Sequence, residues 1–275
     1  MIRSLDEFRQ EAIKKLEKIS EDPLREYMEL FSTATGLSKT HALTNFFEVN
    51  SKRIEDLRLL ETYISQRCTG VPLPYITGME GFWKKEFQVT ADTLIPRPET
   101  ELLVELILSE NKSKCLKVLD LGTGTGAIGI SIAEEMPNWK ITATDVSLLA
   151  LRTAKINSRG LKNINFVQCF WLNSIGTSFD IIVSNPPYIC DDDPHLKYLR
   201  HEPRLALEGG RDGLDPAREI IKTAKKNLVE KGRLYLEHGY DQKDDVTQIL
   251  RQSDFCTIKS YKDFAGHDRV IKAHS

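Results

Sequence analysis

Apolar residues in the first seventy positions recur at intervals of three and four, the spacing of helices with one buried face. The stripe of the first helix is formed by Ile2, Leu5, Phe8, Ala12, Leu16 and Ile19. Pro23 begins a second helix, which Gly36 ends. Ser38 is expected to cap a third helix, and Asn50 or Ser51 a fourth. The region is therefore predicted to be a small helical bundle whose stripes form its core.

The pattern changes after residue 70. Prolines and glycines interrupt short extended pieces between residues 71 and 98, which predicts a linker with a β-hairpin. From residue 99 onward, apolar β-branched runs alternate with amphipathic helical stretches. The predicted strands are 117–121, 140–144, 163–167, 179–184 and 233–237, with two more near Thr257 and Val270. Between the fourth and fifth strands we expect a helix that Asp215 caps and that ends near Gly232.

This alternation predicts a mostly parallel sheet with helices on both faces. The expected organisation is a helical domain at 1–70, a hairpin linker at 71–98 and an α/β domain at 99–275.

Composition narrows the class of protein. The 275 residues are 40% hydrophobic and 28% charged with a net charge of −2, which is ordinary for a soluble globular protein and shows no bias toward nucleic acid or anionic membrane. Five scattered cysteines form no Cys-x-x-Cys pair, so no zinc site or disulfide framework is indicated and a reducing cytoplasm is expected. No apolar run approaches membrane-spanning length, and acids come too early for a signal peptide.

Residues 179–188 combine a buried strand with a stiff loop. Pro186 and Pro187 end the strand, so the loop should lie at its carboxyl end, where open α/β sheets bind ligands. A planar NH2 group has two N–H donors, and the Asn185 carboxamide oxygen and the Pro186 carbonyl can accept them. Tyr188 offers an aromatic wall. For the tetrapeptide alone, a proline turn without chemistry is an even alternative.

A glycine-rich turn follows the strand at 117–121. It consists of Gly122, Thr123, Gly124, Thr125 and Gly126. Such a turn lets backbone N–H groups approach a ligand, but its spacing is neither that of a dinucleotide site nor a Walker A loop, which favours a smaller nucleoside ligand. Asp145 ends the next strand and can accept both ribose hydroxyls, with a helix cap by Asp145 or Ser147 as the alternative. Trp171 could pack on an adenine ring or lie in the core.

These residues resemble the motifs of S-adenosylmethionine-dependent methyltransferases that act on planar nitrogens. Five further stretches resemble the HemK/PrmC family of bacterial release-factor glutamine methyltransferases. They are residues 74–78 with Phe82 and Trp83, 95–101, 202–207, 209–214 and 265–270. The resemblance covers residues 71 to 272. The N-terminal region resembles the family in being helical more than in its individual residues.

The resemblance implies a Rossmann-like seven-stranded sheet with an antiparallel last strand. It implies transfer of a methyl group from S-adenosylmethionine to the side-chain nitrogen (N5) of the glutamine in the Gly-Gly-Gln loop of class I release factors. The cofactor would bind at residues 122–126, Asp145, Trp171 and Asn185. Asn185 would also hold the amide beside the cofactor, together with Pro186, Pro187 and Tyr188. Many relatives carry an acid where this chain has Phe170, so adenine binding is expected to rely on ring packing and the ribose contacts. No metal is expected in the reaction.

Two other functions fit parts of the pattern. An adenine-N6 methyltransferase for DNA or RNA would also bind a planar amine, but it needs a basic surface. Residues 1–70 hold twelve acids against eleven Lys and Arg, and three aspartates occupy positions 191–193 near the proline loop, so nucleic-acid binding is disfavoured. A non-catalytic cofactor-binding adaptor is the third alternative, which the intact motifs argue against. We expect the helical domain to dock the substrate protein.

Overall fold

The computed structural model describes residues 5–37, 54–111, 115–173 and 175–275. Within it the chain divides into two compact units, Met1–Met79 and Glu80–Ser275. The predicted third helix from Ser38 and the caps at Asn50 and Ser51 lie outside the described residues.

The first unit is helical. Its elements are α1 (Leu5–Leu16), α2 (Pro23–Thr35), α4 (Ile54–Cys68) and the short α5 (Leu73–Thr77). Asp22 caps α2 by accepting a hydrogen bond from the Arg25 amide, and Gly36 ends α2 in the left-handed region, as predicted. Buried apolar residues from α1, α2 and α4 form one core. Helix α5 was not predicted, because local proline and glycine content conceals a single helical turn between Pro72 and Gly78.

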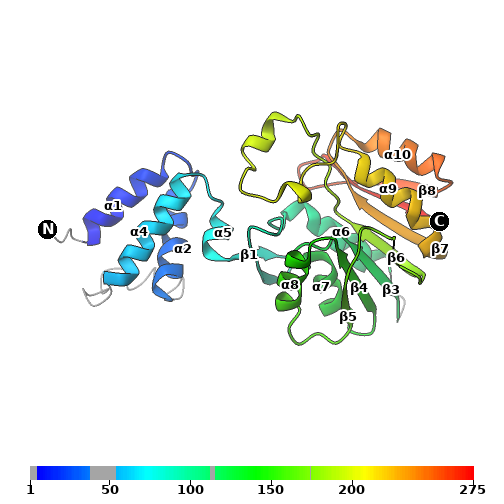
Figure 1. The fold of residues 1–275 in the computed structure, drawn as a ribbon, viewed down its shortest axis with the longest axis horizontal. Coiled ribbons are helices and arrows are strands. Elements are labelled where there is room, and N and C mark those ends of the chain that lie inside the picture. The colour runs from blue at the N-terminus through cyan, green and yellow to red at the C-terminus, as the bar shows by residue number, and fades with distance from the viewer. Residues whose placement is uncertain (1–4, 38–53, 112–114, 174) are drawn as a thin grey trace. The chain divides into compact units, whose positions relative to one another are not determined.

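A two-stranded sheet of β1 (Met79–Phe82) and β2 (Lys85–Gln88) starts at the boundary residue Met79, which confirms the predicted hairpin. A seven-stranded sheet follows, in the order β5-β4-β3-β6-β7-β9-β8 (Figure 1). Its strands are β3 (Lys117–Leu121), β4 (Lys140–Asp145), β5 (Ile164–Gln168), β6 (Phe179–Ser184), β7 (Leu228–Glu237), β8 (Cys256–Lys262) and β9 (Asp268–His274). Strand β9 runs antiparallel to both of its neighbours, and the pairs from β5 to β7 are parallel. The predicted sheet is confirmed.

Helices cover both faces of this sheet, because successive apolar residues of a strand point to opposite faces and both faces must be buried. Val118 packs in a core with α6 (Glu101–Glu110) and α7 (Ala127–Glu135), whereas the next residue, Leu119, packs in a core with α9 (Asp215–Ala224) and α10 (Lys243–Gln252). Helix α8 (Leu148–Asn157) contacts β4 and β5. The central strands are therefore buried on both faces.

Two details of the predicted helix before β7 are wrong. Leu214, not Asp215, is the N-cap residue of α9, and the Asp215 carboxylate instead accepts a 2.9 Å hydrogen bond from Arg218. The helix ends at Ala224, and Gly232 lies inside β7. There the pairing with β6 shifts register, and a Cβ on Gly232 would come within 2.8 Å of the Val229 carbonyl oxygen. Gly232 therefore accommodates a strand irregularity and does not end a helix.

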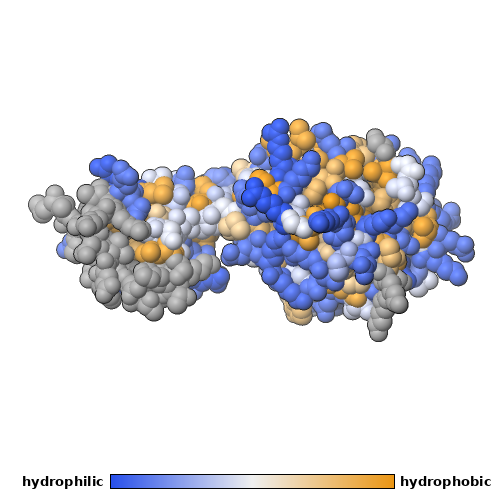
Figure 2. All heavy atoms as spheres, turned by 90° about the horizontal axis from the view of Figure 1, so that it is seen from below, coloured by the Kyte–Doolittle hydropathy of each residue, from blue (hydrophilic) through white to orange (hydrophobic). Residues whose placement is uncertain are grey.

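The surface of the second unit is mostly hydrophilic, with apolar areas scattered over the side shown in Figure 2. Among the described residues, no helix is both long and apolar enough to span a membrane.

Candidate active site

The sheet order reverses direction next to β3, which makes the carboxyl ends of β3, β4 and β6 meet. Strand β3 pairs on one side with β4 and on the other with β6, so Leu121 lies opposite both Thr144 and Ser184. The loops after these strands carry the glycine turn, Asp145 and the Asn185 loop. A reversal of this kind opens a crevice at which α/β sheets bind ligands.

The glycine turn adopts a backbone that only glycine tolerates well. Gly122, Gly124 and Gly126 have φ values of 69°, 56° and 86°. A Cβ on Gly126 would lie 2.4 Å from the Ile130 side chain. The amide of Thr123 donates to the Thr144 carbonyl at 2.8 Å, which holds the turn against β4.

Asp120 fixes the turn from beneath. Its Oδ2 accepts hydrogen bonds from the Thr123 hydroxyl and the Gly129 amide, which links β3 to the turn and to α7. Complete burial raises the pKa of Asp120 to about 6 despite these hydrogen bonds. Sequence analysis gave Asp120 no role of its own, although its position before the glycines was visible.

Asp145 lies at the end of β4 and faces the glycine turn. Its Oδ2 accepts from the Gly124 amide at 2.9 Å and its Oδ1 accepts from the Ser147 amide at 2.8 Å. Ser147, not Asp145, caps α8 through the Ala150 amide. Burial raises the pKa of Asp145 above its ordinary value. The carboxylate is therefore not used as a helix cap and points into the crevice.

A cavity of about 210 Å³ brings most of the predicted cofactor residues together. Its walls include Gly122, Gly124, Asp145, Phe170, Trp171, Asn185 and Pro187. The Trp171 ring lies over the glycine turn, since a Cβ on Gly122 would be 3.5 Å from its Cζ3. Thr123 and Thr125 are buried and, like Gly126, do not line this cavity. They shape the turn instead of facing the crevice.

Phe170 provides an apolar wall of this cavity. Its side chain is 54% exposed, and its ring centroid lies 5.9 Å from that of Trp171 at an angle of 57°. Both side chains line the 210 Å³ cavity. This end of the cavity therefore suits a flat apolar ring.

A second cavity of about 270 Å³ lies on the other side of Asn185. It is lined by Leu94, Arg97, Asn185, Pro186, Tyr188, Ile189, Leu199, Ala206 and Leu207. Asn185 therefore borders both cavities, with Pro187 on the first and Pro186 and Tyr188 on the second. The Asn185 Nδ2 donates a 3.0 Å hydrogen bond to Oγ1 of Thr100, which leaves the carboxamide oxygen for a ligand.

A partly buried ion pair joins two of the stretches on which the family resemblance rests. The Glu202 carboxylate pairs with the Arg97 guanidinium and accepts a 3.2 Å hydrogen bond from the Ile95 amide. Only 3% of the Glu202 side chain is exposed. This contact brings residues 95–101 and 202–207 to one wall of the second cavity.

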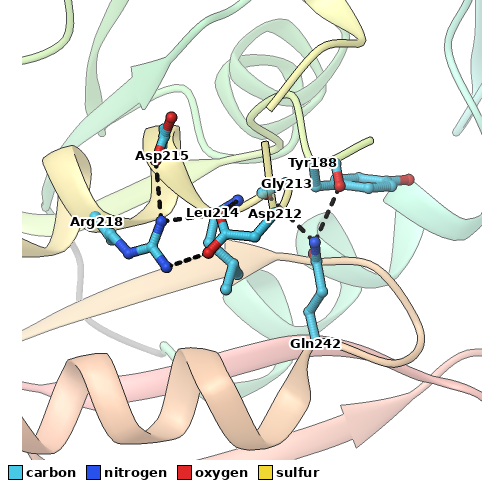
Figure 3. Close-up of polar contacts among 7 residues, drawn as sticks. All are labelled: Tyr188, Asp212, Gly213, Leu214, Asp215, Arg218 and Gln242. Atoms are coloured by element: carbon cyan, nitrogen blue, oxygen red, sulfur yellow. Dashed lines mark hydrogen bonds and ion pairs between the residues drawn. The ribbon is translucent and has the colours of Figure 1, made fainter. Parts of the chain in front are cut away.

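Gln242 holds the backbone of Tyr188 in place. Its Nε2 donates to the carbonyl oxygens of Tyr188 at 3.0 Å and of Gly213 at 3.3 Å (Figure 3). Its Oε1 accepts from the Gly239 amide at 2.9 Å. Gly213 has φ of 73°, and a Cβ there would lie 2.4 Å from the Tyr188 carbonyl oxygen. Sequence analysis missed Gln242, because no local pattern marks a side chain that joins three loops.

The Gly213 loop is itself braced by charge. Asp212 accepts from the Leu214 amide at 3.2 Å and pairs with Arg218 of α9, whose Nη1 lies 2.9 Å from Asp212 Oδ1 (Figure 3). The Arg218 guanidinium lowers the pKa of Asp212 to about 2. These contacts tie the loop that carries Gly213 to helix α9.

The fold is that of a methyltransferase. Residues 98–200 match the methyltransferase small domain family. A methyltransferase from Pyrococcus furiosus superposes with a TM-score of 0.52, at 21% identity over 68% of this chain and 87% of that chain. The catalytic domain of hMettl16 superposes with a TM-score of 0.57, at 16% identity over 78% and 81% of the two chains.

Sequence relatives identify the family within this class. Residues 7–78 match the PrmC N-terminal domain. The release factor glutamine methyltransferase of Coxiella burnetii is 44% identical over 78% of this chain and 79% of its own. Those of Salmonella typhimurium and Escherichia coli are 36% and 37% identical, each over 94% of this chain and 95% of theirs. The chain belongs to the family of release factor glutamine methyltransferases.

Proposed function

We propose that this enzyme transfers a methyl group from S-adenosylmethionine to the side-chain amide nitrogen of the glutamine in the Gly-Gly-Gln loop of class I peptide chain release factors. The family relationship supports the reaction and the substrate class. The observation that supports the mechanism is that Asn185 borders two cavities at once. One side chain can therefore meet both a methyl donor and an acceptor amide.

The first cavity has the groups that S-adenosylmethionine needs. Asp145 offers carboxylate oxygens for ribose hydroxyls, and Phe170 and Trp171 offer aromatic faces for adenine. The positive φ values of Gly122 and Gly124 let the backbone approach closely where a side chain would intrude. When bound, the cofactor supplies an electrophilic methyl group carried on a sulfonium.

The second cavity would orient the amide. An amide nitrogen is a poor nucleophile because its lone pair is delocalised, so orientation has to supply much of the rate. The Asn185 carboxamide oxygen and the Pro186 carbonyl would accept the two N–H groups, and Tyr188 would form a wall beside them. Two fixed acceptors also stabilise the positive charge that develops on nitrogen. Orientation of this kind supplies roughly 7–11 kcal/mol in favourable intramolecular cases.

No strong base is required at the nitrogen, since its proton becomes acidic only as the N–C bond forms. The proton then leaves to water or to a nearby acceptor.

Adenine-N6 methylation, the other reaction compatible with a planar amine, gains no support from the relatives. Asp191 also keeps negative charge close to the loop, where it accepts from the Gly210 amide at 3.1 Å. A phosphate backbone would be repelled there.

The reaction can be tested directly with labelled S-adenosylmethionine and a purified bacterial release factor, followed by peptide mass analysis. We expect one methyl group on the glutamine of the Gly-Gly-Gln loop, and its loss in Asn185→Ala. Asn165→Ala makes the same change at an exposed position of β5 and should retain the product. Label on adenine of added nucleic acid, with none on the glutamine, would contradict the proposal.

We further propose that the helical unit docks the release factor. Its neutral charge balance suits a protein partner better than nucleic acid, and it folds around a core of its own. Removal of residues 1–79, at the boundary between the compact units, should raise KM for the release factor and leave the cofactor Kd unchanged. An unchanged KM in a variant that still binds cofactor would contradict the docking role.

A further inference from the structure

The orientation of the Asn185 carboxamide decides whether the proposed site can work. An amide can rotate by half a turn with almost no change of shape, which exchanges its oxygen acceptor for an NH2 donor. The glutamine amide of the substrate needs an acceptor at this point. The structure must therefore contain a set of hydrogen bonds that keeps the Asn185 carboxamide oxygen directed toward the cavities.

Thr100 provides the first of these hydrogen bonds. It lies at the end of a short 3-10 turn, η1 (Pro98–Thr100), immediately before α6, and is 5% exposed. Asn185 Nδ2 donates to its Oγ1 at 3.0 Å. A hydroxyl has one hydrogen, so Thr100 holds the NH2 side of Asn185 only while its own hydrogen is directed elsewhere.

Glu237 provides the acceptor for that hydrogen. The parallel register pairs Ser184 of β6 with Leu236 of β7, so the next residues, Asn185 and Glu237, follow adjacent positions of the two strands. Glu237 is only 1% exposed, and burial raises the pKa of its carboxylate more than hydrogen bonding from the Thr100 and Tyr188 hydroxyls lowers it. An ionised carboxylate can only accept, so it draws the hydrogens of both hydroxyls toward itself.

We propose that Glu237 is a positioning residue that acts through Thr100 to keep the Asn185 carboxamide oxygen facing the substrate, and that holds the Tyr188 ring at the other end of the same tetrapeptide. The inference rests on the proposed function of the two cavities. Neither cavity, as the described residues line it, includes Glu237, so the carboxylate acts through its two hydroxyl partners and does not touch the substrate.

The second Glu237 oxygen supports a role beyond packing. Its Oε2 is buried and has no hydrogen-bond partner among the described residues. A buried carboxylate with an unpaired oxygen is costly for stability, and such cost is usually found at functional sites. A neutral glutamine at this position would be less costly to bury, yet its NH2 group would compete with the hydroxyls as a donor.

The test uses the full chain with Thr100→Val, Thr100→Ser, Glu237→Gln and the double variant Thr100→Val/Glu237→Gln. Thr153→Val is the matched control, because Thr153 is buried to the same 5% and its hydroxyl bonds within α8. Three quantities are measured for each protein: kcat with the release factor, Kd for S-adenosylmethionine, and Kd for the release factor without cofactor. Thermal unfolding reports whether each variant is folded.

We expect Thr100→Val and Glu237→Gln to lower kcat by about 10²-fold, the effect of misplacing a positioned group, with the cofactor Kd unchanged. Thr100→Ser retains the hydroxyl and should retain most of kcat. Because both residues act along one chain of hydrogen bonds, the double variant should be no slower than the slower single variant. If Glu237→Gln does not fold, the comparison of Thr100→Val with Thr100→Ser still decides whether the Thr100 hydroxyl positions Asn185.

Two outcomes would overturn the inference: normal kcat in Thr100→Val, or a double variant in which the two single losses multiply. Failure of the wild-type chain to methylate the release factor would instead overturn the proposed function. The wild-type assay therefore separates the two failures.

Discussion

The Asp145 carboxylate accepts a 2.9 Å hydrogen bond from the amide of Gly124, so the side chain that ends β4 is fixed against the turn that follows β3. Two adjacent strands thereby present one surface to the first cavity. In the proposed site, this arrangement separates cofactor binding, assigned to Asp145, from orientation of the amide, assigned to Asn185.

Asp145→Ala should weaken S-adenosylmethionine binding much more than it lowers kcat at saturating cofactor. Hydrogen bonds to a charged group contribute about 1.5–3 kcal/mol each, so loss of the ribose contacts predicts a Kd increase of roughly 10- to 100-fold. Titration calorimetry measures this directly. Asp245→Ala, at an exposed position of α10, is the control and should leave Kd unchanged. An Asp145 variant with wild-type affinity would contradict a ribose-binding role.

Replacement of Gln242 should impair turnover without impairing cofactor binding. Gln242→Ala leaves the Tyr188 and Gly213 carbonyls without their donor, at a cost of about 1–3 kcal/mol for each buried group. Gln242→Glu should be worse at high pH, since an ionised carboxylate would face two carbonyl oxygens. It should recover as the pH falls and the glutamic acid becomes a donor. Equal kcat in both variants at every pH would contradict this mechanism.

Gly213→Ala should be among the more damaging single substitutions in the second unit. The new Cβ would lie 2.4 Å from the Tyr188 carbonyl oxygen, and the backbone is held at φ of 73°. Left-handed backbone and a steric clash together predict a loss of more than about 2 kcal/mol in the free energy of unfolding. Chemical denaturation provides the measurement. Gly176→Ala is the control, because a Cβ there meets no atom within 4 Å.

Turnover should fall as the pH is lowered through neutrality. Burial raises the pKa of Glu237 to about 7, against opposing effects from the Thr100 and Tyr188 hydroxyls and the Arg269 guanidinium, while Glu99 adds to the rise. A protonated Glu237 can donate a hydrogen bond, so it no longer forces Thr100 to direct its hydrogen away from Asn185. The kcat profile of the wild type should therefore have an acidic limb near pH 7, which Glu237→Gln should lack.

The raised pKa of Glu237 makes its contribution to stability change with pH in the direction opposite to that of turnover. Because the folded state binds the Glu237 proton more tightly than the unfolded state, this residue favours folding at acidic pH, and that contribution is lost as the pH rises toward 7. Glu237→Gln should therefore raise Tm relative to wild type in alkaline buffer and not in acidic buffer. A variant that is more stable and yet slower would be difficult to explain by a purely structural role.

The strands of the sheet could be predicted from local patterns, because strands and turns depend on residues that are close together in the chain. The run from Phe179 to Ser184 is apolar and β-branched, and the glycines at 122, 124 and 126 are required by local backbone conformation. The helix before β7 was extended too far because Gly232 resembles a helix end, whereas its role depends on the pairing of β7 with β6.

The supporting residues of the site could not be found in this way. Thr100 is 85 positions from Asn185, and Gln242 is 54 positions from Tyr188. Thr100 and Gln242 directly precede α6 and α10, so only the packing of these two helices on the sheet brings the pairs together. Glu237 is the last residue of a strand and shows no sequence pattern that distinguishes it from any other strand end. These contacts arise from strand order and register, which a single sequence reveals only indirectly.

The shared wall between the two cavities has a kinetic consequence. Leu94, Asn185 and Ala206 border both spaces, so under the proposed function donor and acceptor would occupy separate compartments that meet along one boundary. Neither reactant has to leave before the other enters, and no residue has to store the transferred group between two half-reactions. Initial-rate plots at several fixed concentrations of the second reactant should therefore intersect, the signature of a ternary complex, and should not run parallel as in a ping-pong scheme.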